Sequence, residues 1–271
     1  MALLSGYALL VYFAPPAHRT YQNQGDMNAA KAQQMLFGPE RDIVVVGSSL
    51  AARLDAALEN TCIYNLSFAG GSPLQGLTLI RKAGKKPRIV LIEINELLGR
   101  TYGEKYFDAA NIPLAHISRL FWVENKPVNF AISQFVSLAG LKGQQRKTEK
   151  VDPNKIAIGI KLSTELLSKT VTPEKVQNSL LTFTEIVSQF ENEGVNIYFF
   201  EMPIDPALRD LVRPRQAREI IKNAFGERFV EVWTPEEIAT VSTSDGKHLL
   251  SGEAEKLSKK LIEKYPCGMT I

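Results

Sequence analysis

The sequence predicts an α/β fold of three layers, in which helices cover both faces of a five-stranded parallel sheet. Short runs rich in β-branched and aromatic residues recur along the chain, and segments with the helical spacing of apolar residues separate most of them. Strands that alternate with helices in this way form parallel sheets, because each connection has to cross back over a face of the sheet. With 271 residues, 45% of them hydrophobic, the chain is long enough for one such domain with a large core.

Five segments have the composition of strands buried in a parallel sheet. In chain order they are Asp42–Val46, Thr61–Leu66, Arg88–Ile94, Val195–Glu201 and Arg228–Val232. Arg88–Ile94 (RIVLIEI) is the clearest of them, because its centre is an unbroken run of aliphatic residues. We expect the strand order of flavodoxin-like sheets.

Helices are expected between and after these strands. Their predicted ranges are Leu50–Leu58, Pro73–Lys82, Thr172–Glu193, Leu208–Phe225 and Ser251–Tyr265. The third range opens on Thr-Pro-Glu, a typical helix start, because proline is tolerated in the first turn and an acidic residue suits that end of the helix. Residues from about 100 to 170 are less regular, and we expect them to form an insertion that contributes to the wall of a cleft.

The N-terminal end of the sequence is unusually apolar. Residues 2–14 (ALLSGYALLVYFA) carry no charge and stop at Pro15-Pro16, so we interpret 1–16 as an anchor-like segment, 17–41 as a linker with a helix-like run, and 42–271 as the main domain. The apolar run is shorter than the about 20 residues that span a bilayer, and it lacks the basic start of a signal peptide. It is the remainder of a membrane anchor, an uncleaved hydrophobic anchor, or a helix packed on the domain. We favour an anchor, because the run lacks a polar face.

Charge and cysteine content exclude several classes of protein. The 32 basic and 29 acidic residues are spread along the whole chain, without a basic stripe interleaved with aromatic residues, so no nucleic acid is expected as a partner. The two cysteines, Cys62 and Cys267, are too few for a disulfide framework and too far apart for a CxxC metal or redox motif. Cys62 is interpreted as a small buried hydrophobic residue, and one long-range disulfide stays open if the protein is exported.

Residues with catalytic chemistry follow the predicted strands. Ser49 follows the first strand, Gly70 the second and Asn95 the third, while the last strand leads through a loop to Asp245 and His248. Ligands bind outside the carboxyl ends of parallel strands, so these residues are expected to gather at one edge of the sheet. A serine with a histidine base oriented by a carboxylate performs acyl transfer, and backbone and amide N–H groups stabilise the oxyanion that forms. Ser49 would also lie at the start of a helix, which favours negative charge.

Four segments resemble, in content and order, the successive sequence blocks of the SGNH (GDSL-like) hydrolases: VVVGSSL, NLSFAGG, IEIN and DGKHLLSGEA. They span residues 44–254, most of the chain, and Asp-x-x-His-Leu in the last block is the most specific. The resemblance implies the α/β/α fold of that family, and no metal or organic cofactor. It assigns Ser49 as nucleophile, Gly70 and Asn95 as oxyanion donors, and Asp245 with His248 as the acid and base.

Two blocks depart from the family pattern. The usual Gly-Asp-Ser is Gly47-Ser48-Ser49 here, a form that resembles acyltransferase-like and surface-polymer-modifying members. The third block is usually Gly-x-Asn-Asp, whereas this chain has Glu93-Ile94-Asn95-Glu96 and so lacks the glycine.

Three functional hypotheses follow. The first is a serine-dependent esterase or O-acyltransferase that acts outside the cytoplasm, transferring acetyl groups to a cell-surface or secreted polysaccharide or removing them. The expected partner is an acylated carbohydrate or another small acyl ester, with membrane association through residues 2–14. The second is a catalytically silent binding or assembly protein of the same fold, because two blocks are imperfect. The third is a lipid esterase held at a membrane by the apolar N-terminus.

Overall fold

The computed structural model describes residues 2–13, 21, 23–59, 61–98, 115, 117–139 and 152–268. The chain divides into two compact units. The helical unit comprises Met1–Pro39 and Gly103–Glu149, and the sheet unit comprises Glu40–Tyr102 and Lys150–Ile271. Much of the segment predicted as an insertion (99–114, 116 and 140–151) and the end of the anchor-like segment lie outside the described residues.

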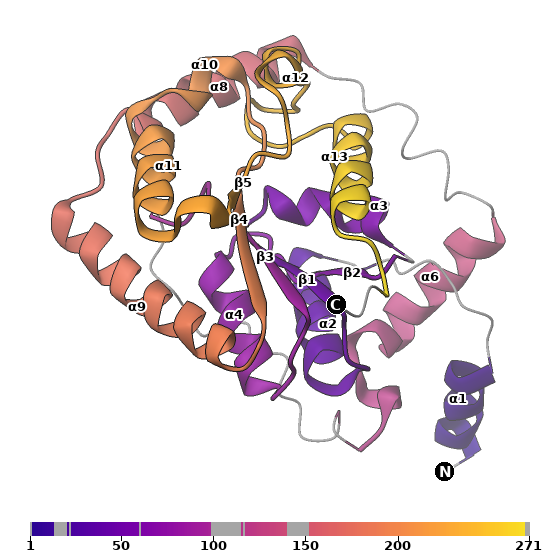
Figure 1. Ribbon diagram of the computed structural model, residues 1–271. Helices are drawn as coiled ribbons and strands as arrows, with labels where there is room; N and C mark the ends of the chain where they lie inside the picture. The colour runs from indigo at the N-terminus through magenta and orange to yellow at the C-terminus, as the bar shows by residue number, and fades with distance from the viewer. Residues whose placement is uncertain are drawn as a thin grey trace. The chain divides into compact units, whose positions relative to one another are not determined.

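The sheet unit is built on five parallel strands, as predicted (Figure 1). They are β1 (Ile43–Val46), β2 (Ile63–Asn65), β3 (Ile89–Glu93), β4 (Asn196–Phe200) and β5 (Phe229–Val230). Their order is β2-β1-β3-β4-β5, and every neighbouring pair is parallel. The α/β prediction and its flavodoxin-like strand order are therefore confirmed.

The register places the carboxyl ends of β1 and β3 side by side. Every residue of both strands is buried, as expected for central strands covered on both faces. Val46 pairs with Ile92, so the residues that follow, Gly47 and Glu93, leave the sheet at the same level. This edge carries the candidate site.

Helices cover both faces of the sheet (Figure 1). On one face, Leu257 and Leu261 share a core with Ile43 and Val45 of β1. On the other face, the Phe199 ring contacts Phe183 at a centroid distance of 6.4 Å and Phe225 at 4.4 Å. The first face is covered by the 3₁₀-helix η1 (Ala51–Leu54), α3 (Asp55–Leu58) and α13 (Ser251–Lys264), and the second by α4 (Pro73–Lys82), α9 (Pro173–Asn192) and α11 (Val212–Phe225).

Two predicted helices are less regular than expected. The segment 50–58 begins as η1, in which the Arg53 amide bonds to the Leu50 carbonyl three residues back, and it becomes α-helical only at Asp55. The segment 208–225 is split into α10 (Pro206–Arg209) and α11, because Pro214 has no N–H to donate and fits only in the first turn of a helix. Helix α4 has the predicted ends.

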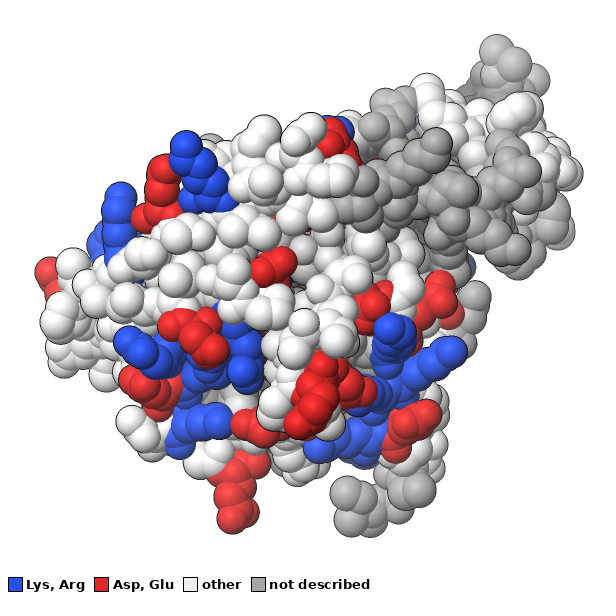
Figure 2. Space-filling model, turned by 90° about the horizontal axis from the view of Figure 1, so that it is seen from above, with Lys and Arg blue, Asp and Glu red and all other residues white. Residues whose placement is uncertain are grey.

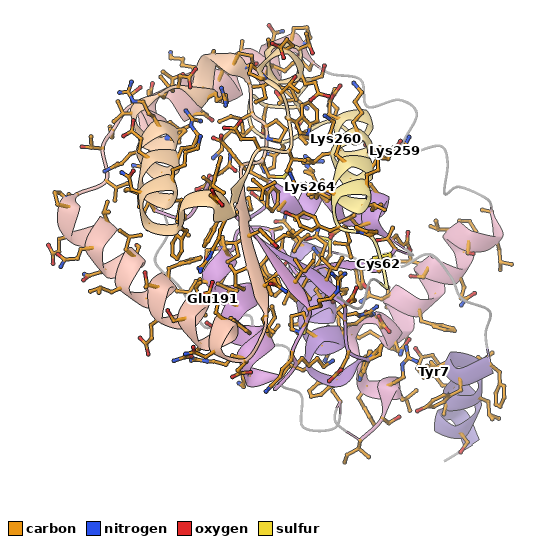
Figure 3. All side chains as sticks on the ribbon, viewed as in Figure 1. Tyr7, Cys62, Glu191, Lys259, Lys260 and Lys264 are labelled. Carbon is orange, nitrogen blue, oxygen red and sulfur yellow. A yellow bond between two sulfur atoms is a disulfide. The ribbon has the colours of Figure 1, made fainter. Side chains whose placement is uncertain are left out.

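A disulfide and an ion pair lie at the end of the sheet where β1, β2 and β3 begin, opposite the end at which these strands lead into the candidate site. Cys62 bonds to Cys267 with a Cα–Cα distance of 5.6 Å, although 205 residues separate them (Figure 3 labels Cys62). Arg88 makes two 2.9 Å hydrogen bonds to Asp42 and one of 3.1 Å to the Pro266 carbonyl. The long-range disulfide that the sequence left open is therefore formed, and the interpretation of Cys62 as a small buried hydrophobic residue is wrong, because Cys62 is only partly buried and is bonded to Cys267. Such a disulfide indicates an oxidising, extracytoplasmic location.

Charged side chains of both signs are interspersed on the face drawn in Figure 2. Ion pairs among the described residues include Lys256 with Glu253 at 2.9 Å and Lys222 with Glu231 at 3.0 Å. Lys259, Lys260 and Lys264 lie along α13 (Figure 3).

Among its described residues, the helical unit has three longer helices. They are α1 (Ala2–Phe13), α2 (Gln24–Phe37) and α6 (Pro127–Leu138), with 3₁₀ turns η3 (Arg119–Phe121) and η4 (Val123–Asn125) before α6. Gln33 of α2 accepts a 2.7 Å hydrogen bond from the Val123 amide, and the Tyr7 ring of α1 meets Phe130 of α6 edge-on at 5.8 Å (Tyr7 is labelled in Figure 3). None of the helices in the described ranges has both the length and the apolar character required to cross a membrane.

Candidate active site

Ser49 lies in the turn that follows β1. Its neighbour Ser48 is fully buried, and the Ser48 hydroxyl accepts a hydrogen bond from the Leu50 amide at 3.2 Å. Ser49 is only partly buried. The two adjacent serines therefore differ, because the Ser48 side chain is used inside the turn whereas the Ser49 side chain is accessible.

Asp245 and His248 share a tight turn ahead of α13. The Asp245 Oδ1 atom accepts hydrogen bonds from the backbone amides of Lys247 at 3.0 Å and His248 at 2.8 Å, as in an Asx turn. Gly246 has φ +87°, a left-handed conformation that favours glycine. Its amide donates to the Thr243 hydroxyl at 3.0 Å, which fixes the base of the turn.

The structure brings three of the predicted site residues together. His248 Nε2 lies 3.0 Å from Ser49 Oγ, and His248 Nδ1 lies 2.7 Å from Asp245 Oδ2. Both distances are within hydrogen-bond range, and the contact between Ser49 and His248 joins residues 199 positions apart in the sequence. A carboxylate that orients an imidazole, which in turn contacts a serine hydroxyl, is the arrangement that activates serine as a nucleophile.

The pKa of Asp245 is lowered by its hydrogen bonds. Partial burial disfavours its charged form, but the hydrogen bonds from the His248 ring and from the two backbone amides outweigh this effect and hold the pKa of Asp245 well below its usual range. Asp245 is therefore a carboxylate at neutral pH. As a carboxylate it accepts a hydrogen bond from the Nδ1–H group of His248, which leaves Nε2 free to accept a proton from Ser49.

Helix α8 (Pro153–Leu167) packs against the turn of Asp245 and His248 through a glycine. A Cβ atom on Gly159 would lie 2.3 Å from the Asp245 carbonyl oxygen, and one on Gly246 would lie 2.7 Å from Ile160. Both positions need glycine for this close approach, so α8 fixes the turn from outside.

Two backbone amides, that of Ser49 after β1 and that of Gly70 after β2, are candidates to bind an oxyanion. Within the described part of the chain, neither the Ser49 nor the Gly70 amide donates a hydrogen bond. Gly70 is exposed and has φ +76°, in the turn that follows β2. The Ser49 amide was not predicted as an oxyanion donor.

Among the described residues, Asn95 makes no hydrogen bond to the other predicted site residues. Its side-chain amide pairs with the backbone of Met202 in both directions, donating to the carbonyl at 2.9 Å and accepting from the N–H at 2.8 Å. An asparagine amide has two N–H bonds, so one donor of Asn95 remains for another acceptor. The predicted helix-terminus effect at Ser49 is also weaker than expected, since η1 and α3 have only four residues each.

Three charged residues at this edge were not predicted as part of the site. Lys247 forms an ion pair with Glu96, which links the turn of His248 to the turn of Asn95. Glu93, the last residue of β3, is fully buried and accepts a 2.6 Å hydrogen bond from the Ser48 amide. An acidic residue in an otherwise apolar strand was the signal that could have identified Glu93.

Comparison of the chain with family models, curated proteins and solved structures found no match. The geometry of the site therefore carries the functional argument. In the described ranges, no group of three or more His, Cys, Asp or Glu side chains is placed to hold a metal ion.

Proposed function

We propose that the protein is a serine-dependent acyl-ester enzyme of the SGNH type, acting on O-acetyl groups of a cell-surface or secreted polysaccharide. The observation that carries this proposal is the continuous hydrogen-bonded series from Asp245 Oδ2 through His248 to Ser49 Oγ, with spacings of 2.7 and 3.0 Å.

The chemistry follows from these three side chains. Ser49 Oγ attacks the ester carbonyl carbon while His248 Nε2 takes the hydroxyl proton, and the carbonyl oxygen becomes an oxyanion beside the Ser49 and Gly70 amides. When the intermediate collapses, the carbon–oxygen bond to the alcohol breaks and Nε2 returns its proton to the departing oxygen. An acyl group then remains on Ser49.

A second alcohol or water completes the reaction by the same route in reverse. The acceptor loses its proton to His248 Nε2 as it attacks the acyl carbon, and Ser49 Oγ recovers that proton as it leaves. Water gives hydrolysis, and a sugar hydroxyl gives transfer. Transfer is favoured in the proposal because the Gly-Ser-Ser form of the first block resembles acyltransferase-like members.

The proposed location is the periplasm or the cell surface. The Cys62–Cys267 disulfide supports an oxidising compartment. Association with a membrane through residues 2–14 is supported by α1, which carries no charged residue and leaves Leu9 59% and Phe13 81% exposed. At about 1.5 Å per residue, a helix of this length is too short for the about 30 Å hydrocarbon core, so it would insert at the interface or continue an anchor.

Labelling by a fluorophosphonate probe tests the nucleophile. Wild-type protein and Ser48→Ala should both be labelled and should both hydrolyse a short aryl ester, because the buried Ser48 hydroxyl serves the turn. Ser49→Ala should lose the label and at least about 10⁴ of the turnover, since removing a nucleophile of this kind eliminates the covalent route. Absence of labelling in the wild type would favour the silent binding protein. Loss in Ser48→Ala alone would place the nucleophile one residue earlier.

The acceptor is tested by supplying an acetyl donor with and without acetyl-free oligosaccharides. Acetylated oligosaccharide should appear in step with donor loss, because a transferase holds its acceptor at high effective concentration against water. Free acetate at a rate indifferent to every oligosaccharide would leave an esterase. A preference for long-chain aryl esters would point to lipid substrates instead.

A further inference from the structure

A carboxyl group that the proposed mechanism does not use lies directly against the turn of the nucleophile. Glu93 is 0% exposed, and no Lys or Arg among the described residues forms an ion pair with it. Its Oε2 atom accepts a 2.6 Å hydrogen bond from the Ser48 amide, and its Oε1 atom accepts one of 3.3 Å from the Glu96 amide. Each oxygen therefore contacts a different turn.

Stability alone gives no reason for a carboxyl group at this place. Removing an acidic side chain from water without a cation costs several kcal/mol in general, whereas an apolar residue would suit an otherwise apolar strand. Burial raises the pKa of Glu93, although the hydrogen bonds from Ser48 oppose the rise. A buried carboxyl group without a cation is expected where its hydrogen bonds position the residues of a functional site.

The sheet register places the Glu93 carboxyl beside the turn that carries Ser49. Val46 and Ile92 are paired, so Gly47 and Glu93 face each other as the two chains leave the sheet. A Cβ atom on Gly47 would lie 2.9 Å from Glu93 Oε2 and 2.9 Å from its Cβ, a separation that real side chains do not reach. Gly47 is therefore the residue that lets the Glu93 carboxyl reach the Ser48 amide.

We propose that Glu93 is a positioning residue that holds Ser49 in its attacking geometry by fixing the Ser48 amide. This inference rests on the proposed function, because it assumes that Ser49 is the nucleophile. The peptide unit fixed by Glu93 joins Gly47 to Ser48, one unit before the peptide that carries the Ser49 amide, so the carboxyl constrains the turn from which the Ser49 side chain and amide project.

The same carboxyl aligns the other turns of the site. Its bond to the Glu96 amide closes the turn that carries Asn95, and Glu96 in turn pairs with Lys247, the neighbour of His248. Contacts thus run from the nucleophile turn through Glu93 and Glu96 to the turn of the base.

Three substitutions of Glu93 separate positioning from folding. Glu93→Gln keeps an oxygen in reach of the Ser48 amide, Glu93→Asp withdraws the carboxyl by one methylene, and Glu93→Ala removes it. Glu201→Gln is the matched control, because Glu201 is also an acidic residue beside a strand end, 12% exposed, but pairs with Arg218 instead of the nucleophile turn. Measured quantities are the rate constant of fluorophosphonate labelling at Ser49, kcat and KM on a short aryl ester, and the midpoint of thermal unfolding.

Glu93→Asp and Glu93→Ala should slow labelling and kcat by about 10²-fold with little change in KM, since a displacement of about 1 Å at a reacting group costs that much. Glu93→Gln should recover labelling to within about tenfold of the wild type, because its amide oxygen replaces the bond of Oε2. Glu201→Gln should lower the unfolding midpoint without slowing labelling.

Two outcomes would overturn the assignment while leaving Ser49 as nucleophile. One is a wild-type labelling rate in folded Glu93→Asp or Glu93→Ala, and the other is equal slowing in Glu93→Gln and Glu93→Asp. A wild-type protein that the probe does not label at all would instead overturn the proposed function.

Discussion

Replacing Asp245 by asparagine tests the orientation of the base, because the change keeps the size of the side chain but removes its negative charge and replaces one acceptor oxygen with an NH₂ donor. The two backbone amides that meet Oδ1 at 2.8 and 3.0 Å require an acceptor, so the asparagine oxygen should occupy that position. Its NH₂ group then faces His248 Nδ1, where Oδ2 lies at 2.7 Å in the wild type. A donor at this place selects the imidazole tautomer that carries its proton on Nε2.

That tautomer cannot act as the base, because it presents an N–H to Ser49 Oγ. To recover the productive form, the amide must flip and leave two backbone N–H groups facing its NH₂. Each unsatisfied donor costs about 1–3 kcal/mol, so the flip costs about 2–6 kcal/mol and lowers turnover by about 30-fold to 10⁴-fold. The same change in another serine enzyme, a worked case for such triads, costs about 10⁴-fold in kcat.

The assay is kcat on a short aryl ester together with the labelling rate at Ser49, with thermal unfolding as a check of the fold. Asp205→Asn serves as the control, because Asp205 also accepts a backbone hydrogen bond near this edge, from Ala207 at 2.9 Å, and asparagine caps a helix equally well. The control should match the wild type. Asp245→Asn with turnover within about tenfold of the wild type would refute the role of Asp245 in setting the tautomer.

Two further predictions concern the oxyanion site and the disulfide. Asn95→Ala should lower kcat by about 10²–10³-fold if its remaining N–H binds the oxyanion, whereas near-normal kcat with a lower unfolding midpoint would show that Asn95 only anchors the Met202 backbone. Replacing Cys62 and Cys267 together by alanine should lower the free energy of unfolding in urea by up to about 5 kcal/mol, the chain-entropy value for a closed loop of 205 residues. An unchanged urea midpoint after this substitution would mean that the disulfide does not constrain the unfolded chain.

The strands could be predicted because their signal is local. Ile43–Val46 and Ile89–Glu93 are short runs of aliphatic and β-branched residues that suit a sheet covered on both faces, and the structure places strands there. The start of the helix after Ser49 could not be predicted in the same way. It follows a turn whose Ser48 amide is bonded to Glu93, a residue 45 positions away, and no local pattern encodes that contact.

In the candidate site, too, local features could be predicted, whereas features set by long-range contacts could not. The positions of Ser49, Asp245 and His248 followed from their residue types at strand ends, because parallel strands deliver such residues to one edge. The orientation of Asn95 depends on hydrogen bonds to Met202, 107 residues later in the chain, and no sequence pattern encodes that contact. Pairing of the two cysteines likewise required the position of the chain after α13 relative to β2.

The long-range disulfide has a consequence for how the protein is made. Synthesis proceeds from the N-terminus at about 5–20 residues per second, so Cys267 follows Cys62 by about 10–40 s. During that interval the Cys62 thiol has no native partner, and an exported chain would meet an oxidising environment with one reactive sulfur exposed. The interval between the synthesis of Ser49 and that of His248 is almost as long. Neither the disulfide nor the arrangement of Ser49, His248 and Asp245 can form while the first strands are being translated. Both form only after the same C-terminal segment has been synthesised.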